Sequence, residues 1–252
     1  MMKLLLRAVG FTFSVVALAS GVRAADITVS AASSLTNAFQ EIGRRFERDH
    51  PGDRVLFNFG ASGQLAQQIV RGAPVDVFAA ADQDSMDKVE REGALDRATR
   101  RDFTRNALVL VVPADARTVV RELGDLRQAS VRRIAIGNPE SVPAGKYAKL
   151  ALTRSGLWDV LQDRLIQTIN VRQVLDYVAR GEVDAGFVYA TDALVMPQRV
   201  RNVLAVEVPV PILYPVAAVR GGGNRRGGAA FVEYLRSEPA REILARFGFL
   251  PP

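Results

Sequence analysis

Short strand-like runs alternate with amphipathic helical runs along almost the whole chain, and this pattern constrains the fold more than any other feature of the sequence. The first pair, ITVSAASSLTNAFQEIGRRF (residues 27–46), starts with alternating apolar residues and continues with apolar residues at helical spacing. Such alternation is typical of a parallel sheet that carries helices on its faces. The sequence therefore predicts an α/β fold.

The alternation occurs in two sets, which indicates two domains. We expect strands at residues 27–32, 54–62, 75–81, 107–113, 133–138, 185–190, 203–209 and 211–219, and helices at residues 35–48, 64–71, 84–92, 144–154, 171–180, 229–236 and 239–246. The middle set is a second complete βα unit, and the last helices are expected to return to the first set.

The expected architecture is two doubly wound α/β domains joined by two crossing strands. Residues 25–106 and 209–252 would form the first domain, and residues 107–208 the second. The apolar runs 107–113 and 212–219 are the predicted crossings, because both are long enough to pass from one domain to the other.

The first 24 residues have the pattern of a secretory signal peptide. Lys3 and Arg7 precede an apolar run at residues 9–19, and residues 22–24 offer small side chains for cleavage. The apolar run is too short to span a membrane. The chain contains no cysteine, which excludes disulfides, thiol catalysis and lipid attachment. We therefore expect a free protein of a bacterial periplasm that is not a lipoprotein.

The charge of the chain argues against nucleic-acid binding. The leader would remove three of the 33 basic residues and none of the 27 acidic ones, so the net charge would fall from +6 to +3. The arginines are scattered in pairs along the sequence, such as Arg44-Arg45 and Arg132-Arg133, and do not cluster in one segment. This distribution is typical of a solvated surface.

Two of the expected helices are preceded by serines. Ser33 and Ser34 follow the first strand, and Ser62 ends the second strand and precedes the next helix in GASGQLAQQI. A helix amino terminus exposes N–H groups without intrahelical partners and attracts anions. The serines could cap their helices, or they could bind an oxyanion.

Three further positions have the same double interpretation. Pro143 is expected near the start of a helix, which leaves Ala144 with a free N–H, and Asn170 is a natural N-cap before Val171. Tyr189 ends a predicted strand, where its phenol could lie in the core or donate to a ligand. Several helix amino termini after sheet strands favour a ligand cleft between the two domains.

Catalytic and metal sites find little support in the sequence. The segment GASG at residues 60–63 approaches a nucleophile elbow, but Gln64 stands where the final glycine belongs, and His50 is the single histidine. A Ser-His-Asp triad is therefore disfavoured. One histidine and no cysteine also disfavour a metal site formed by side chains.

Several segments together resemble a known family. The segments are AASSLTNAFQEI, FNFGASGQLAQQI, GAPVDVFAAADQDSMD, AIGNPESVPAGKYAKLAL, GFVYATDA and RFGFL. Their order and spacing resemble the periplasmic molybdate-binding proteins of molybdate ABC transporters, which are two-domain solute-binding proteins of type II. The resemblance extends over essentially the whole chain after the leader.

The resemblance implies a function and a ligand site. The positions that contact the ligand in this family correspond here to Ser34, Ser62, Ala144, Val171 and Tyr189. It implies a monomeric, non-catalytic receptor that captures molybdate, and tungstate too, in an interdomain cleft and delivers it to a membrane permease driven by a cytoplasmic ATPase. The molybdate ion would be bound through its oxygens, so that no protein group would ligate the metal directly. The protein would need no cofactor.

The chemistry of molybdate is consistent with these five positions. Molybdate at neutral pH is a dianion whose oxygens only accept hydrogen bonds, so hydroxyls and N–H groups are suitable partners. We expect no lysine or arginine in contact with the ligand. Two alternatives stay open from the residues alone: a receptor for another tetrahedral oxyanion such as sulfate, and an exported serine hydrolase that uses Ser62 or Ser34.

Overall fold

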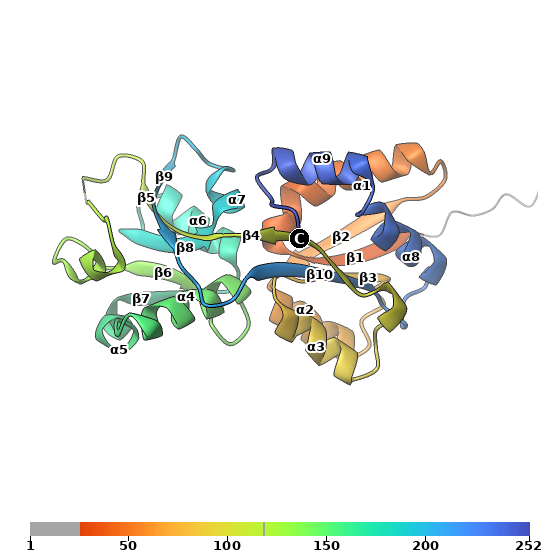
Figure 1. Cartoon of the computed structure of the whole chain (residues 1–252), viewed down its shortest axis with the longest axis horizontal. Helices are drawn as coiled ribbons and strands as arrows, with labels where there is room; N and C mark the ends of the chain where they lie inside the picture. Colours follow the sequence, from red (N-terminus) through yellow and green to blue (C-terminus); the bar gives the residue numbers. More distant parts are fainter. Residues whose placement is uncertain (1–25, 118) are drawn as a thin grey trace, which may run out of the picture.

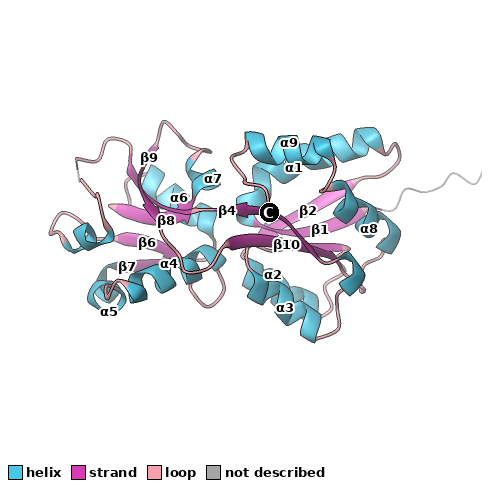
Figure 2. Ribbon diagram, in the orientation of Figure 1, coloured by secondary structure: helices cyan, strands magenta, loops and turns pink. Residues whose placement is uncertain are grey.

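The protein consists of two α/β lobes that lie side by side (Figure 1). The computed structural model describes residues 26–117 and 119–252. The predicted signal peptide at residues 1–24 lies outside these described residues. Each lobe is built on a five-stranded sheet, and helices flank both sheets (Figure 2).

The first lobe contains the beginning and the end of the described chain. Its sheet has the order β2-β1-β3-β10-β4, in which β1 is parallel to β2 and β3 whereas β10 is antiparallel to β3 and β4. Helices α1 and α9 lie on one side of this sheet and α2 and α3 on the other (Figure 1). The elements are β1 (Ile27–Ala32), α1 (Thr36–Asp49), β2 (Val55–Gly60), α2 (Ser62–Val70), β3 (Val77–Ala79), α3 (Gln83–Arg91), β4 (Arg101–Asn106), β10 (Ile212–Ala218), α8 (Arg225–Tyr234) and α9 (Glu238–Arg246), with the short 3-10 turns η1 (Ser33–Leu35) and η2 (Arg97–Thr99).

The second lobe contains the middle of the chain. Its sheet has the order β7-β6-β8-β5-β9, in which β6 is parallel to β7 and β8 whereas β5 is antiparallel to β8 and β9. The elements are β5 (Leu108–Pro113), η3 (Leu123–Arg127), β6 (Ile134–Gly137), α4 (Pro143–Arg154), α5 (Trp158–Leu161), η4 (Gln162–Arg164), β7 (Leu165–Thr168), α6 (Val171–Ala179), β8 (Ala185–Tyr189), α7 (Ala190–Ala193) and β9 (Val200–Val206). The predicted two-lobed α/β architecture is confirmed, but both sheets are mixed and not wholly parallel.

The chain passes between the lobes at two short connections. The first is Ala107, between β4 and β5, and the second is the segment 207–211, between β9 and β10. The run 212–219, predicted as a crossing strand, pairs within the sheet of the first lobe and is not itself a crossing. The other predicted run, 107–113, begins at the first connection and then pairs within the sheet of the second lobe. We propose domain boundaries within these connections, after residues 106 and 208.

Two strands, β4 and β7, were missed by the sequence pattern. Strand β4 has the sequence RDFTRN and lies at the edge of its sheet, where the charged side chains of Asp102 and Arg105 are exposed. Strand β7 is also an edge strand and has only four residues. Short or polar edge strands bury few side chains, so they leave a weak apolar signal.

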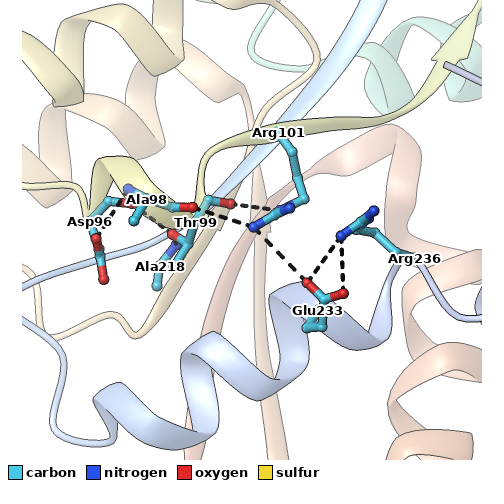
Figure 3. Close-up of polar contacts among 7 residues, drawn as sticks. All are labelled: Asp96, Ala98, Thr99, Arg101, Ala218, Glu233 and Arg236. Carbon is cyan, nitrogen blue, oxygen red and sulfur yellow. Dashed lines mark hydrogen bonds and ion pairs between the residues drawn. The ribbon is translucent and has the colours of Figure 1, made fainter.

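The last two helices pack on the first lobe. Phe231 of α8 is fully buried and contacts the ring of Phe39 from α1, with ring centroids 6.1 Å apart. Figure 3 shows the polar edge of this packing, where Glu233 of α8 approaches Arg101 of β4 at 4.0 Å. Nearby, the Thr99 hydroxyl accepts from an N–H of β10 at 2.9 Å. Exposed ion pairs add little stability, so burial of the aromatic rings holds α8 in place.

No helix within residues 26–117 and 119–252 combines the length and the apolar character that a membrane crossing needs.

Candidate functional site

The five predicted ligand positions line one small hollow between the lobes. Ser34 of η1 and Ser62 of α2 come from the first lobe, whereas Ala144 of α4, Val171 of α6 and Tyr189 of β8 come from the second. Its cavity volume is only about 10 Å³. Pockets for organic ligands usually measure about 300–1,000 Å³, so the hollow is far too small for such a ligand.

The rest of the hollow is lined by small and apolar residues. They are Ala32, Ser33, Gly60, Ala61, Ala81, Val142 and Pro143. None of the described residues that line it carries a charge. A ligand bound there would meet hydroxyl groups, backbone N–H groups and methyl groups.

Neither serine caps a helix through its side chain. The N-cap residues of α1 and α2 are Leu35 and Ala61, and no side-chain capping bond forms at either end. The Ser62 hydroxyl oxygen instead accepts a hydrogen bond from the Ala81 N–H at 3.0 Å. The Ser34 hydroxyl oxygen lies 2.9 Å from the Tyr214 hydroxyl. The capping interpretation is therefore wrong for both serines.

The bond from Ala81 decides what Ser62 can do. A hydroxyl has one hydrogen and two lone pairs, and one lone pair of Ser62 is occupied by the Ala81 N–H. Its hydrogen has no acceptor among the described residues, although the side chain is fully buried. Ser62 can therefore donate to an acceptor placed in the hollow.

Tyr189 offers a second donor. Its hydroxyl is buried and has no hydrogen-bond partner among the described residues. Burial raises the pKa of the Tyr189 phenol well above its ordinary value, so the group keeps its hydrogen. A buried polar atom without a partner is uncommon and costly in a native protein, so this hydroxyl suits a ligand acceptor.

The second lobe also directs two helix amino termini at the hollow. Helix α4 begins at Pro143, so Ala144 is its second residue and its N–H lies in the first turn, where no intrahelical acceptor exists. Close packing fixes this end, because a Cβ on Gly145 would overlap the carbonyl oxygen of Gly137 at the end of β6. The helix dipole favours negative charge at such an end.

Helix α6 is capped as the sequence predicted. The Asn170 side chain accepts from the Gln173 N–H at 3.0 Å, which leaves the N–H of Val171 at the first position of the helix without an intrahelical partner. The N–H groups of Ala144 and Val171 belong to different helices of the same lobe. Together they supply backbone donors that no substitution other than proline removes.

Direct contacts join the lobes beside the hollow. The Gly63 N–H of α2 donates to the Ser141 carbonyl of the second lobe at 3.0 Å. A Cβ on Gly63 would lie 2.8 Å from that oxygen, which is too close for any side chain. Lys146 of α4 forms an ion pair with Asp84 of α3 and lies 4.0 Å from Asp82. The lobes are therefore closed on each other.

Arg172 is a further connection between the lobes that the sequence did not reveal. Its guanidinium donates to the Asn37 side chain at 2.8 Å and to the Ser34 carbonyl at 3.2 Å, both in the first lobe. Its Nε also lies 2.6 Å from the buried carboxylate of Asp192, with which it forms an ion pair. Burial raises the pKa of Asp192, and Arg172 opposes that shift.

The position of Arg172 agrees with an uncharged ligand shell. The guanidinium is absent from the lining of the hollow, although it donates to the carbonyl of Ser34. One signal could have indicated its role: Asp192 follows a buried strand, and a buried carboxylate needs a cationic partner.

The structure offers little to a catalytic or metal interpretation. His50 lies at the carboxyl end of α1, stacked on Phe46, whereas Ser34 precedes the amino end of the same helix. Fourteen helical residues span about 21 Å. Within the described part of the chain, no group of three or more His, Cys, Asp or Glu side chains could hold a metal ion.

Comparison with known proteins gives consistent results. A family described as bacterial extracellular solute-binding protein matches residues 27–250. The molybdate-binding protein ModA of Escherichia coli strain K12 is 40% identical over 228 residues, which cover 88% of this chain and 88% of that protein. A putative ABC transporter substrate-binding lipoprotein of Bacillus subtilis, YvgL, is 38% identical over 224 residues, covering 88% of this chain and 85% of that protein.

A solved structure agrees with these relatives. The substrate-binding domain of a putative molybdenum ABC transporter from Clostridium difficile superimposes with a TM-score of 0.69 at 37% identity. The match covers 90% of this chain and 99% of that one. Fold and sequence therefore point to the same group of proteins.

Proposed function

Because the chain belongs to the family of bacterial extracellular solute-binding proteins, we propose that it captures molybdate between its two lobes and delivers it to an ABC permease. Its relatives are substrate-binding proteins of ABC transporters, so the protein is a binding protein and not an enzyme. This sets aside the serine-hydrolase alternative for Ser34 and Ser62.

The buried, unpartnered hydroxyl of Tyr189 is the observation that carries the proposal most directly. It faces the same hollow as the two serines and the two helix amino termini, and no charged side chain lines that hollow within the described residues. Molybdate can only accept hydrogen bonds, so each of these donors has a suitable partner in it. The proposed contacts are the hydroxyls of Ser34, Ser62 and Tyr189 and the N–H groups of Ala144 and Val171.

Tungstate is included in the proposal, because it has the same charge and shape as molybdate and nearly the same size. Sulfate is a smaller tetrahedron, and it would leave some donors stretched or unpaired. Each unmet buried donor costs about 1–3 kcal/mol, and about 1.4 kcal/mol corresponds to a tenfold change in affinity. A few unmet donors would make the affinity for sulfate orders of magnitude lower than the affinity for molybdate.

The route of the ligand completes the proposal. The protein would act as a monomer in the periplasm and pass molybdate to a membrane permease powered by a cytoplasmic ATPase. The Bacillus relative is described as a lipoprotein. A bacterial lipoprotein carries its lipid on a cysteine, and this chain has none, which supports a free protein here.

Titration of the ligand-free protein with molybdate, tungstate, sulfate and phosphate tests the proposal. We expect calorimetric binding of one equivalent of molybdate or tungstate, with sulfate and phosphate weaker by at least about a hundredfold. Equal affinity for sulfate and molybdate, or no binding of molybdate, would contradict it.

A further inference from the structure

A chain of hydrogen bonds reaches Ser34 from the connection between the lobes. It starts at Asn106, the last residue of β4, whose side-chain oxygen accepts from the Ala107 N–H at 2.9 Å. That bond fixes the orientation of the amide. The amide nitrogen then donates to the Tyr214 oxygen at 3.2 Å and to the Thr191 hydroxyl oxygen at 2.9 Å.

The direction of the next bond follows from this arrangement. Tyr214 is fully buried, and its oxygen already accepts a hydrogen from Asn106. Within the described residues, the one acceptor available to the Tyr214 hydrogen is the Ser34 hydroxyl oxygen at 2.9 Å. Burial raises the pKa of Tyr214 well above its ordinary value, so the phenol keeps this hydrogen. Tyr214 therefore donates and Ser34 accepts.

The consequence concerns the hydrogen of Ser34. Since one lone pair of Ser34 receives the Tyr214 hydrogen, its own hydrogen has no protein acceptor and is free for an acceptor in the hollow. Ser62 is held in the same state by the Ala81 N–H. In Ser62 the orienting donor belongs to the backbone, whereas in Ser34 it belongs to side chains that can be changed.

We propose that Asn106 and Tyr214 are positioning residues that fix Ser34 as a hydrogen-bond donor and thereby select oxyanions that carry no proton. This inference rests on the proposed function and adds residues outside the ligand shell to it. An oxyanion that carries a proton, such as monohydrogen phosphate, needs an acceptor. If Ser34 accepted that proton, one buried hydroxyl hydrogen of the Ser34–Tyr214 pair would be left without a partner.

Substitution of Asn106 by aspartate should reverse the direction of the hydrogen bonds that lead from residue 106 to Ser34. One carboxylate oxygen can still accept from the Ala107 N–H, but the other accepts where the amide nitrogen donated. Tyr214 would then donate to the carboxylate, and Ser34 would donate to Tyr214. The hydroxyl of Ser34 would present a lone pair to the ligand, which repels molybdate and suits the proton of monohydrogen phosphate.

Asn37→Asp is the matched control for the added charge. Asn37 also lies beside the lobe interface, where its side-chain oxygen accepts from Arg172 at 2.8 Å, and it is outside the hydrogen-bond chain. An aspartate there adds the same negative charge and keeps an acceptor for Arg172. Asn37→Asp should lower the affinities for molybdate and for phosphate by similar factors, because the substitution acts only through its added negative charge.

The experiment is calorimetric titration of the wild type and both variants with molybdate and with phosphate at neutral pH. In Asn106→Asp we expect molybdate affinity to fall at least about a hundredfold and the ratio of molybdate to phosphate affinity to fall at least about tenfold. In Asn37→Asp that ratio should stay within about twofold of the wild-type value. Equal ratios in the two variants would overturn the inference.

A second pair of variants decides the matter if Asn106→Asp does not fold. Tyr214→Phe removes the donor to Ser34 and should lower the affinity for molybdate roughly tenfold. Tyr234→Phe removes a tyrosine hydroxyl that donates to Asp49 far from the hollow, and it should leave affinity unchanged. Unchanged affinity in Tyr214→Phe overturns the inference. Failure of the wild type to bind molybdate would instead reject the proposed function.

Discussion

The two lobes contribute different kinds of donor to the hollow. The first lobe contributes the hydroxyls of Ser34 and Ser62, each of which accepts a hydrogen bond from another part of that lobe. The second lobe contributes the N–H groups at the starts of α4 and α6, together with the Tyr189 hydroxyl, which has no protein partner in the described chain. Donors of the first lobe depend on side chains, whereas the backbone donors of the second lobe depend on helix position.

This difference predicts where the site tolerates substitution. A change of side chain at a serine removes the donor itself. A change at Ala144 or Val171 leaves the N–H in place, so it matters only if the new side chain crowds the hollow.

Gly63→Val should have the largest effect. A Cβ at this position would lie 2.8 Å from the Ser141 carbonyl oxygen, so the lobes could not approach as closely as they do. Donors of the two lobes would then fail to reach one ligand together. We expect molybdate affinity to fall by at least about a hundredfold, with the melting temperature of the ligand-free protein little changed.

Calorimetric titration and thermal melting measure these two effects separately. Gly72→Ala is unsuitable as a control, because Gly72 has a φ of +90° that strains any side chain. Gly221→Ala is better matched, since a Cβ there has open space and the residue does not line the hollow. Normal affinity in Gly63→Val would show that closure does not need the Gly63–Ser141 contact.

Ser62→Ala should have the next largest effect. The substitution removes a hydroxyl donor and leaves the Ala81 N–H without its acceptor. A hydrogen bond to a charged group contributes about 1.5–3 kcal/mol, so molybdate affinity should fall roughly 10- to 100-fold. The same titration, combined with melting curves of the ligand-free protein, checks it. A variant that binds normally and merely melts earlier would show that Ser62 is structural.

Tyr189→Phe should weaken binding roughly tenfold and leave the ligand-free protein at least as stable as the wild type. The ring keeps its packing, and the hydroxyl that is lost makes no protein hydrogen bond within the described residues. Ligand-free melting temperature and molybdate affinity are the two readouts. A marked loss of ligand-free stability would mean that the hydroxyl serves the fold.

Ala144→Ser should have little effect, within about twofold, because the backbone N–H at the start of α4 is retained. This variant is the counterpart of Ser62→Ala in the other lobe. Titration with molybdate compares the two directly. A loss as large as that of Ser62→Ala would show that the second lobe is crowded at this position and would remove the contrast between the lobes.

A change of pH should have the smallest effect on molybdate affinity. Hydroxyls of serine and backbone N–H groups do not titrate, and burial raises the pKa of Tyr189 above its ordinary value. A raised phenol pKa keeps the protonated donor form at every pH below it, so the donor would be lost only in strongly alkaline solution. Molybdate affinity should therefore stay within about twofold between about pH 7 and pH 9. A fall across this range would indicate that another group binds the ligand.

Much of the fold could be predicted from the sequence, because strands and helices that bury apolar faces leave a periodic signal. Strands such as β5 and β8 and the helix α6 with its Asn170 cap carry that signal strongly. The antiparallel direction of β5 and β10 could not be predicted, since strand direction depends on which connection the chain takes and not on side-chain pattern.

The site could be predicted in part. Local sequence indicates Ser34, Ser62, Ala144, Val171 and Tyr189 as candidates at the junctions of strands and helices, and the resemblance to a known family selects the same five positions. The supporting residues could not be found in this way. Asn106, Tyr214 and Arg172 act across sequence separations of 85 to 180 residues, and local patterns contain no information about such pairings.

A crystal structure of the protein with bound molybdate tests the central claim most directly. We predict one molybdate in the hollow between the lobes, with its oxygens within hydrogen-bond distance of the Ser34, Ser62 and Tyr189 hydroxyls and of the N–H groups of Ala144 and Val171. No arginine or lysine side chain should contact it. A molybdate held by Arg172 or Lys146, or one bound outside this hollow, would contradict the claim.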